Sequence, residues 1–597
     1  MKKNDFINKL LNFFFNKNYG KWILVLFIIA MVLRIIAANN MTTNADEMLH
    51  ATHAIDISNA GVLQIMDEDP VWFYLTDLGY KVFGVSMFSG RFLSILFGAL
   101  SVLIIYLLGK EMFNKKVGYI SAFILAFSPY YLINTLAEMD IAMTFFILLT
   151  AYLMFKGLKD NNNKLLILSY ISFGIAILMK TIAAVVLPAF IIFFIYYRNK
   201  KEIKIFHKSN IKQILIFAII LILLLSPIFT FNYLLYKDKG IVDVQFSRFT
   251  GIGKEVYASI EGTMKPFRIQ DLFFNYPPGH QPGIYEGLRF YWMYGIVTFL
   301  LGIVGIIPSF KRNFKSSLFL SLIFIFPFIF LAGTSILPYH FCFGVPIFAL
   351  FGANALSGIQ NKIIKLTKIN KRIILYILLG LIIISSLFIA NDNSSIFKGK
   401  SEVAKMMDYT KNIEDNALVV VDTRIYRGRI AWIFNDKHYI EAVHLENLFL
   451  DMDKLPGEIV QLPVYFIECV TDDCGWGSIA GQPELNQSME SAVKLFNNIT
   501  TPIKDIKEPY GEVYFRVYKV DLPLKLSALD IADITHTWFY YPVRYKAEDW
   551  FDKYKTHNAF DSLLNMAAHL ILYLAILLAI VSIFYSFYLL IKEDGKT

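Results

Sequence analysis

The sequence predicts an α-helical polytopic membrane protein, with about twelve spans, that carries one α/β domain outside the membrane. Hydrophobic residues make up 56% of the 597 residues and charged residues only 18%. The mean hydropathy of the chain is +0.50. Long apolar runs recur along the chain, and one long polar stretch separates the last run from the others.

Twelve apolar runs approach the length of about 20 residues that an α-helix needs to cross a bilayer. The predicted spans are residues 22–39, 87–108, 117–134, 139–156, 164–180, 182–197, 212–231, 290–309, 316–333, 341–357, 373–390 and 566–591. Pro129 predicts a bend or an end within the third span, because proline interrupts the hydrogen-bond ladder of a helix.

Lysine and arginine fall mainly on one side of these spans, and by the positive-inside rule this side is cytoplasmic. It holds both termini and the short loops near residues 110–116, 156–164, 198–208, 311–315 and 362–372. The chain is therefore expected to be a multi-pass protein of the cell membrane with both termini in the cytoplasm. Because the basic residues lie in these loops, the net charge of +9 indicates orientation in the lipid bilayer and no binding of nucleic acid.

Three segments are then expected outside the membrane: residues 40–86, 232–289 and 391–565. We divide the chain into a membrane domain (1–390), an extracytoplasmic domain (391–565) and a final span with a cytoplasmic tail (566–597).

Alternating helical and strand patterns predict a small α/β domain with a partly parallel sheet over residues 391–565. Strands are predicted at 417–422, 438–442, 463–468 and 512–520, and helices at 402–413, 426–434 and 489–499. Cys469 and Cys474 can close a small ring. A disulfide is favoured over a metal site because no nearby histidine or further cysteine completes one.

An acidic pair, Asp46 and Glu47, follows the first span at the predicted outer face. A carboxylate in this position can serve as a catalytic base. The pair also suits the first turn of a helix, where acids interact with the positive end of the helix dipole. Asp46 is the candidate base, and Glu47 is a candidate catalytic partner that orients a substrate.

A second acidic pair, Glu138 and Asp140, lies in the short outer turn between the third and fourth spans. Ionisable residues at membrane depth are costly and usually functional. The two acids can orient toward sugar hydroxyls or a common divalent cation, or they can cap the fourth span. Oxygen ligands favour Mg²⁺ or Mn²⁺, and no organic cofactor is expected.

Four further residues are candidates for substrate binding. Arg91 and Lys180 lie near apolar span interiors and can hold a phosphate group. Tyr339 and His340 place an aromatic ring and an imidazole at the outer face, where each can contact substrate or serve a structural role.

The order and spacing of these motifs resemble the GT-C superfamily, in particular the protein O-mannosyltransferases and the lipid A aminoarabinose transferases. The resemblance rests on Asp46-Glu47, the stretch that leads to Trp72, Gly90-Arg91, the turn with Glu138 and Asp140, and residues 339–346.

The resemblance implies a membrane glycosyltransferase that transfers a sugar, with inversion, from a dolichyl- or undecaprenyl-phosphate donor to a protein, lipid or glycan acceptor on the outer membrane face. It implies that Asp46 deprotonates the acceptor, that residues 1–390 are catalytic, and that two helices near 46–60 and 71–83 lie along the membrane. The alternative class is a transporter or a non-enzymatic envelope assembly protein.

One departure from these relatives concerns the lipid phosphate. Where the aminoarabinose transferases carry a Lys-Pro-Pro that grips this phosphate, the present chain has Asp69-Pro70-Val71. The phosphate must therefore be held by other residues or through a cation.

Overall fold

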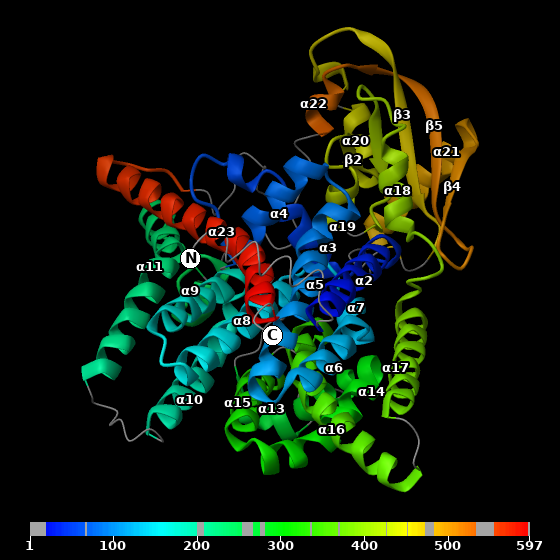
Figure 1. The fold of residues 1–597 in the computed structure, drawn as a ribbon. Coiled ribbons are helices and arrows are strands. Elements are labelled where there is room, and N and C mark those ends of the chain that lie inside the picture. The colour runs from blue at the N-terminus through cyan, green and yellow to red at the C-terminus, as the bar shows by residue number, and fades with distance from the viewer. Residues whose placement is uncertain are drawn as a thin grey trace, which may run out of the picture.

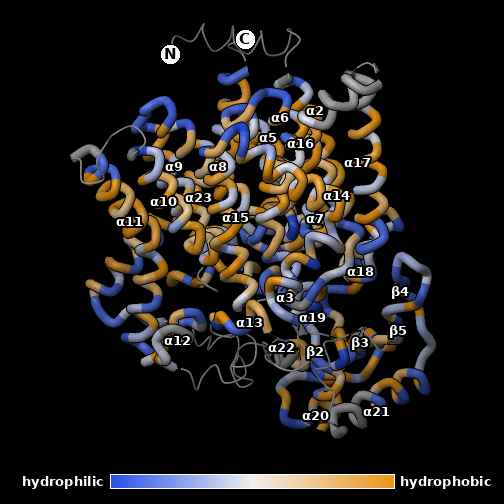
Figure 2. The backbone as a smooth tube through the Cα atoms, turned by 90° about the horizontal axis from the view of Figure 1, so that it is seen from below, coloured by the Kyte–Doolittle hydropathy of each residue, from blue (hydrophilic) through white to orange (hydrophobic). Residues whose placement is uncertain are grey.

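The computed structural model describes residues 19–65, 69–199, 208–253, 267–274, 281–334, 337–367, 371–425, 427–450, 452–471, 474, 483–532 and 554–594. These residues form a bundle of long helices and a smaller α/β domain that lies at one end of it (Figure 1). Figure 2 shows that the helices of the bundle are mainly hydrophobic and that hydrophilic segments gather at its two ends.

Ten of the described helices are long and apolar enough to cross a membrane, and each lies on a predicted span. They are Gly20–Asn40, Met87–Met112, Asp140–Lys159, Thr181–Arg198, Asn210–Lys239, Gly283–Arg312, Phe314–Ala332, Pro338–Gly358, Ile377–Ser394 and Ala559–Asp594. A shorter apolar helix of 17 residues, α9 (Asn163–Met179), lies on another predicted span.

The predicted third span, residues 117–134, consists of two helices, α6 (Lys115–Ala126) and α7 (Pro129–Ile133). The helix breaks at Ser128, whose side chain caps α7 by accepting a hydrogen bond from the Tyr131 N–H. Pro129 occupies the first position of α7, where its missing N–H has no cost. The interruption predicted from the proline is therefore present.

Two helices, α3 (Ala45–His53) and α4 (Pro70–Phe83), follow the first span, as the resemblance implied. The first helix begins at Asn44, whose side-chain oxygen accepts a hydrogen bond of 2.7 Å from the Glu47 N–H. This cap fixes where α3 starts and places Asp46 and Glu47 in its first turn.

The centre of the bundle is formed by α5 (Met87–Met112), α8 (Asp140–Lys159) and α16 (Gly344–Thr367), whose apolar windows are 89%, 94% and 89% buried. By contrast, α11 (Lys208–Lys239) and α17 (Lys371–Ser394) lie at the periphery. Only 22% of the residues in the most apolar stretch of each, within Asn210–Lys239 and Ile377–Ser394, are buried. The remaining helical elements of this part are α2 (Tyr19–Asn40), η1 (Ile57–Asn59), η2 (Thr181–Val186), α10 (Leu187–Asn199), α12 (Val244–Thr250), α13 (Ile269–Phe273), α14 (Gly283–Arg312), α15 (Phe314–Ala332), η4 (Pro338–Phe343) and α23 (Ala559–Asp594).

The α/β domain contains a five-stranded mixed sheet in the order β2-β1-β3-β5-β4. β1 pairs in parallel with β2 and β3, whereas β5 pairs antiparallel with β3 and β4. The strands are β1 (Leu418–Val421), β2 (His438–Glu441), β3 (Ile459–Cys469), β4 (Pro502–Lys507) and β5 (Val513–Lys525). The helices are α18 (Glu402–Thr410), α19 (Arg427–Ile433), η5 (Ala442–His444), α20 (Leu445–Leu450), η6 (Met452–Lys454), α21 (Pro483–Ile499) and α22 (Ala528–Ala532).

The two faces of this sheet pack against different helices, because successive strand residues point to opposite sides. Leu418 and Val420 belong to a core that includes Phe496 of α21. Val419 and Val421 belong to the larger core that also contains the membrane bundle. The α/β domain is therefore joined to the bundle through a continuous buried surface.

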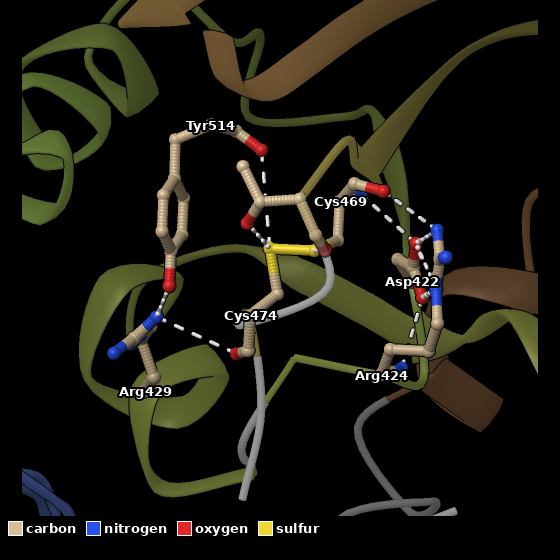
Figure 3. Close-up of a disulfide and its surroundings, with 7 residues drawn as sticks. Asp422, Arg424, Arg429, Cys469, Cys474 and Tyr514 are labelled. Carbon is tan, nitrogen blue, oxygen red and sulfur yellow. Dashed lines mark hydrogen bonds and ion pairs between the residues drawn. A yellow bond between two sulfur atoms is a disulfide. The ribbon is translucent and has the colours of Figure 1, made fainter. Parts of the chain in front are cut away.

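The predicted disulfide between Cys469 and Cys474 is present, with their Cα atoms 5.9 Å apart (Figure 3). The partly parallel sheet is also confirmed. The edge strand β4 was not predicted, and the reason is physical: its residues are exposed except for Ile506, so they show no alternation of apolar and polar side chains.

Candidate active site

Asp46 lies in the first turn of α3 and is only partly buried. The Tyr339 hydroxyl, from η4, donates a short hydrogen bond to Oδ2 of Asp46. Within the described part of the chain, Oδ1 of Asp46 has no hydrogen-bond partner. This carboxylate is therefore held by one oxygen and can accept a proton on the other.

Glu47, by contrast, is fully buried and fully occupied. Its carboxylate accepts hydrogen bonds from Arg91 Nε at 2.5 Å, from Arg91 Nη2 at 2.7 Å and from the Ala137 N–H at 2.7 Å. This geometry does not fit the expectation that Glu47 contacts a substrate. We assign it a positioning role that links α3 to α5 and to the turn before α8.

Arg91 is also fully buried, and its five N–H groups all have acceptors. Besides Glu47, they are the carbonyl oxygens of Ala38, Met41 and Thr42, at 2.7, 3.0 and 2.9 Å. A phosphate could bind Arg91 only by displacing these bonds. Our assignment of Arg91 to substrate binding therefore does not fit the structure, and the residue instead fixes the end of α2.

Lys180, Asp140 and His340 form a largely buried polar cluster, to which the C-terminal cap of α9, the first residue of α8 and the middle of η4 contribute. Lys180 Nζ lies 2.7 Å from Asp140 Oδ2 and 3.2 Å from His340 Nδ1. His340 Nδ1 also lies 3.3 Å from Asp140 Oδ1. Lys180 Nζ also lies 5.9 Å from the centre of the Tyr339 ring. An ammonium group has three donors, so one N–H of Lys180 is left without a hydrogen-bond partner among the described residues.

Glu138 is paired with His50, which was not among the candidate residues predicted from the sequence. His50 Nδ1 lies 3.0 Å from Glu138 Oε2, whereas Glu138 Oε1 is buried and has no partner among the described residues. Burial raises the pKa of Glu138 to about 7, against the opposing effect of His50. The signal in the sequence that could have found His50 was its spacing from Asp46. His50 follows Asp46 by four residues, and residues i and i+4 share one face of a helix.

Asp69, which replaces the basic residue of the resembling families, also reaches this region. It is buried, and its Oδ1 accepts a hydrogen bond of 2.8 Å from the Thr181 N–H. Thr181 directly follows Lys180. Asp69, at the start of α4, therefore fixes the segment that carries Lys180. This contact is a structural role for an acid at this position.

The expected metal site at Glu138 and Asp140 does not fit the placement of these acids. Glu138 is directed to His50, whereas both oxygens of Asp140 face Lys180 and His340. No group of three or more metal-binding side chains is present among the described residues. These contacts do not test whether Mg²⁺ or Mn²⁺ is required, and Lys180 is the better placed partner for an anion.

A small apolar cavity of about 10 Å³ lies near the Lys180 cluster. Its lining comes from α8, η2, α15, η4 and α16: Met143, Thr144, Ile147, Leu148, Ile182, Val186, Ile323, Pro327, Leu331, Phe343 and Ile347. Thr144 follows Asp140 by one turn of α8, and Ile182 lies two residues after Lys180. A largely buried cation thus lies near a small apolar space within the helical bundle.

The chain is similar to known proteins over part of its length. Residues 67–229, which include α4, both acidic turn residues and Lys180, match the model of the family described as dolichyl-phosphate-mannose-protein mannosyltransferase. An uncharacterised protein of Aquifex aeolicus is 29% identical over 178 residues, which are 29% of this chain and 34% of that protein. YkcB of Bacillus subtilis, whose name describes it as a candidate mannosyltransferase, is 28% identical over 166 residues, or 27% of this chain and 23% of YkcB. The chain therefore matches about a third and a quarter of the length of these relatives.

The fold is shared over a longer stretch. ArnT from Cupriavidus metallidurans, solved with bound undecaprenyl phosphate, superposes with a TM-score of 0.52 at 10% identity, covering 84% of this chain and 98% of ArnT. The chain thus shares the fold of ArnT over most of its length, and the resemblance drawn from the sequence is confirmed at the level of the fold.

Proposed function

We propose that this protein is a membrane glycosyltransferase that transfers a sugar from a polyprenyl-phosphate donor to an acceptor on the outer membrane face. The observation that carries the proposal is the placement of three features side by side: the Asp46 carboxylate, the Lys180 cluster and the apolar cavity. Tyr339 and His340 are consecutive residues, and they join the first two features because one contacts Asp46 and the other contacts Lys180.

Each feature suits one part of such a donor. The cavity is small, about 10 Å³, so its apolar lining and not its volume suits contact with a prenyl chain. The N–H of Lys180 that lacks a hydrogen-bond partner suits the phosphate that joins chain and sugar. ArnT, which shares the fold, was solved with undecaprenyl phosphate. This supports a lipid phosphate as the leaving group.

The chemistry then follows from the charges. The acceptor oxygen attacks the anomeric carbon of the sugar, Asp46 takes the proton of the acceptor hydroxyl, and the bond from the anomeric carbon to the phosphate oxygen breaks. Attack opposite the leaving phosphate inverts the anomeric centre. Lys180 offsets the charge that develops on the phosphate, and the hydrogen bond from Tyr339 keeps the Asp46 carboxylate oriented toward the acceptor.

The test compares a deletion strain carrying the wild-type gene with one carrying Asp46→Asn. Mass spectrometry of glycans and lipid-linked sugars should show that the deletion removes one sugar from a glycoconjugate and accumulates the corresponding polyprenyl-phosphate sugar. Asp46→Asn should be expressed normally and behave like the deletion, because loss of a general base costs about 100-fold or more in rate.

The matched control is Asp392→Asn, which makes the same change at an exposed acid at the end of α17. It should restore the wild-type glycan. Wild-type product in the Asp46→Asn strain would refute the assignment of the base, and unchanged glycans and lipid-linked sugars in the deletion strain would refute the proposed function.

A further inference from the structure

The α/β domain packs directly against the helix that carries Asp46. Helix α19 of this domain lies beside α3 (Figure 1). The Thr52 hydroxyl, on α3, donates a hydrogen bond of 3.1 Å to the carbonyl oxygen of Gly428, on α19. These two helices are separated by more than 370 residues in sequence, so the contact arises only in the folded chain.

Arg429 is the charged residue at the centre of this contact, and it is buried. Its Nε lies 3.2 Å from the sulfur of Met48, two residues after Asp46. Its Nη1 donates to the Tyr514 hydroxyl at 2.5 Å and to the Cys474 carbonyl oxygen at 3.4 Å (Figure 3). One guanidinium therefore touches α3, strand β5 and the disulfide loop together.

The disulfide fixes the partners of Arg429. Cys474 is bonded to Cys469 at the end of β3, and its sulfur lies 3.8 Å from the Tyr514 carbonyl oxygen (Figure 3). The Cys469 N–H donates a hydrogen bond of 2.9 Å to Asp422, which pairs with Arg424. Of the acceptors of Arg429, Tyr514 thus belongs to the sheet and Cys474 is tied to it by the disulfide. Among the described residues, its hydrogen-bond contact that reaches the membrane domain is the one with Met48.

Two further contacts hold the same region from other sides. Glu402, the first residue of α18, accepts a short hydrogen bond from the Thr42 hydroxyl, just before α3. Trp432 of α19 packs on Gly90, where an added Cβ would lie 2.6 Å from its ring. Gly90 precedes Arg91, the partner of Glu47. The α/β domain therefore contacts the Asp46 helix and its supports at several points.

We propose that Arg429 is a positioning residue for the active site: from the α/β domain it holds α3, and with it Asp46, in the orientation needed for transfer. This inference rests on the proposed function. A buried guanidinium suits the task because its rigid fork binds several acceptors at fixed angles. A shift of about 1 Å in a catalytic group can lower a rate by about 100-fold, so a residue that never touches substrate can govern turnover.

The first experiment measures the mobility of α3 directly, without any substrate. Amide hydrogen exchange of peptides covering residues 45–53 is followed in the purified full chain and in Arg429→Ala. We expect exchange in α3 to accelerate by about 10-fold or more, because local opening sets these rates. Peptides from the centre of α8 should keep their wild-type exchange.

The matched control is Arg516→Ala, on the same strand as Tyr514. Arg516 is partly exposed and pairs with Asp505 of β4 at 3.2 Å. It should leave exchange in α3 unchanged. Unchanged α3 exchange in Arg429→Ala, or equal acceleration in both variants, would overturn the proposal.

The second experiment separates turnover from binding. Membranes of the deletion strain, which hold the accumulated donor, supply the substrates, and undecaprenyl phosphate is the binding probe. Arg429→Ala should lower turnover by about 10-fold or more, while affinity for undecaprenyl phosphate stays within about twofold of the wild type. Arg429→Lys, which keeps the charge but loses the fork, should recover part of the turnover.

Folding of each variant is checked by the oxidation state of Cys469 and Cys474 and by thermal unfolding. If Arg429→Ala does not fold, Arg429→Lys and Met48→Leu test the same contact from its two sides. Equal loss of turnover and of probe binding would overturn the positioning role. If the wild-type chain transfers no sugar, the proposed function fails, and the exchange measurement still decides whether Arg429 holds α3.

Discussion

Two adjacent acids, Asp46 and Glu47, have opposite environments. Successive residues of a helix point about 100° apart, so one faces the open region near Tyr339 and the other faces the buried Arg91. A half-exposed carboxylate can exchange its proton with a substrate, whereas a buried carboxylate in a complete ion pair cannot do so without breaking the pair. The sequence could place both acids at the membrane face but could not divide these roles.

Glu47→Gln tests the positioning role of the buried pair. The change leaves the Arg91 charge buried without its counter-ion, which costs about 3–5 kcal/mol. We expect a large fall in thermal stability of the purified protein, measured by unfolding in detergent. Glu286→Gln is the control, because Glu286 pairs at 3.0 Å with a half-exposed Arg289 and such surface pairs contribute at most about 1 kcal/mol. A stable Glu47→Gln variant that has lost only its turnover would instead make Glu47 a catalytic group.

The pairing of Glu138 and Asp140 with basic side chains bears on whether these two acids bind a divalent cation. Because Asp140 is paired with Lys180 and Glu138 with His50, we expect turnover in membranes to persist in EDTA. Lys180→Met should then abolish turnover, since it removes the cation nearest the apolar cavity. Loss of turnover in EDTA that Mg²⁺ or Mn²⁺ restores would show that Glu138 and Asp140 rearrange to bind a metal, as their spacing in sequence suggested.

At the scale of elements, the sequence predicted the helices well, because a membrane span is encoded by an apolar run that needs no tertiary contact. The break at Ser128 was equally local, since Pro129 dictates it. Strand β4 and the pairing of α19 with α3 were not accessible in this way. An exposed edge strand has no hydrophobic period, and a helix–helix contact across the whole chain depends on the complete fold.

Gly90→Ala tests the packing of α19 on the membrane domain. An added Cβ would meet the Trp432 ring at 2.6 Å and the Tyr80 hydroxyl at 2.9 Å. Overpacking of this kind costs about 1–3 kcal/mol, so the melting temperature should fall. Gly79→Ala, on α4, is the control because its nearest contact would be an ordinary 3.6 Å. Equal stability of the two variants would show that the α5–α19 contact is loose.

At the scale of the whole molecule, the orientation in the membrane stays a prediction from the distribution of lysine and arginine. A cysteine introduced at Glu512, in the exposed loop before β5, should react with a membrane-impermeant maleimide in intact cells. A cysteine introduced at the exposed Lys164, in the first turn of α9, should react only after permeabilisation. The reverse pattern would place the α/β domain in the cytoplasm.

The long separation in sequence between α3 and α19 also determines the order in which these helices are synthesised. The ribosome completes the helix that bears Asp46 early, whereas the residues that hold it, up to Tyr514, emerge after most of the membrane bundle has been inserted. A nascent or truncated chain that stops before α19 therefore holds α3 through the Glu47–Arg91 pair but lacks the contacts of Thr52 and Met48 with α19. If Arg429 positions α3 as proposed, such a chain should transfer less sugar than the complete chain, because the last contacts on α3 form only when synthesis is nearly complete.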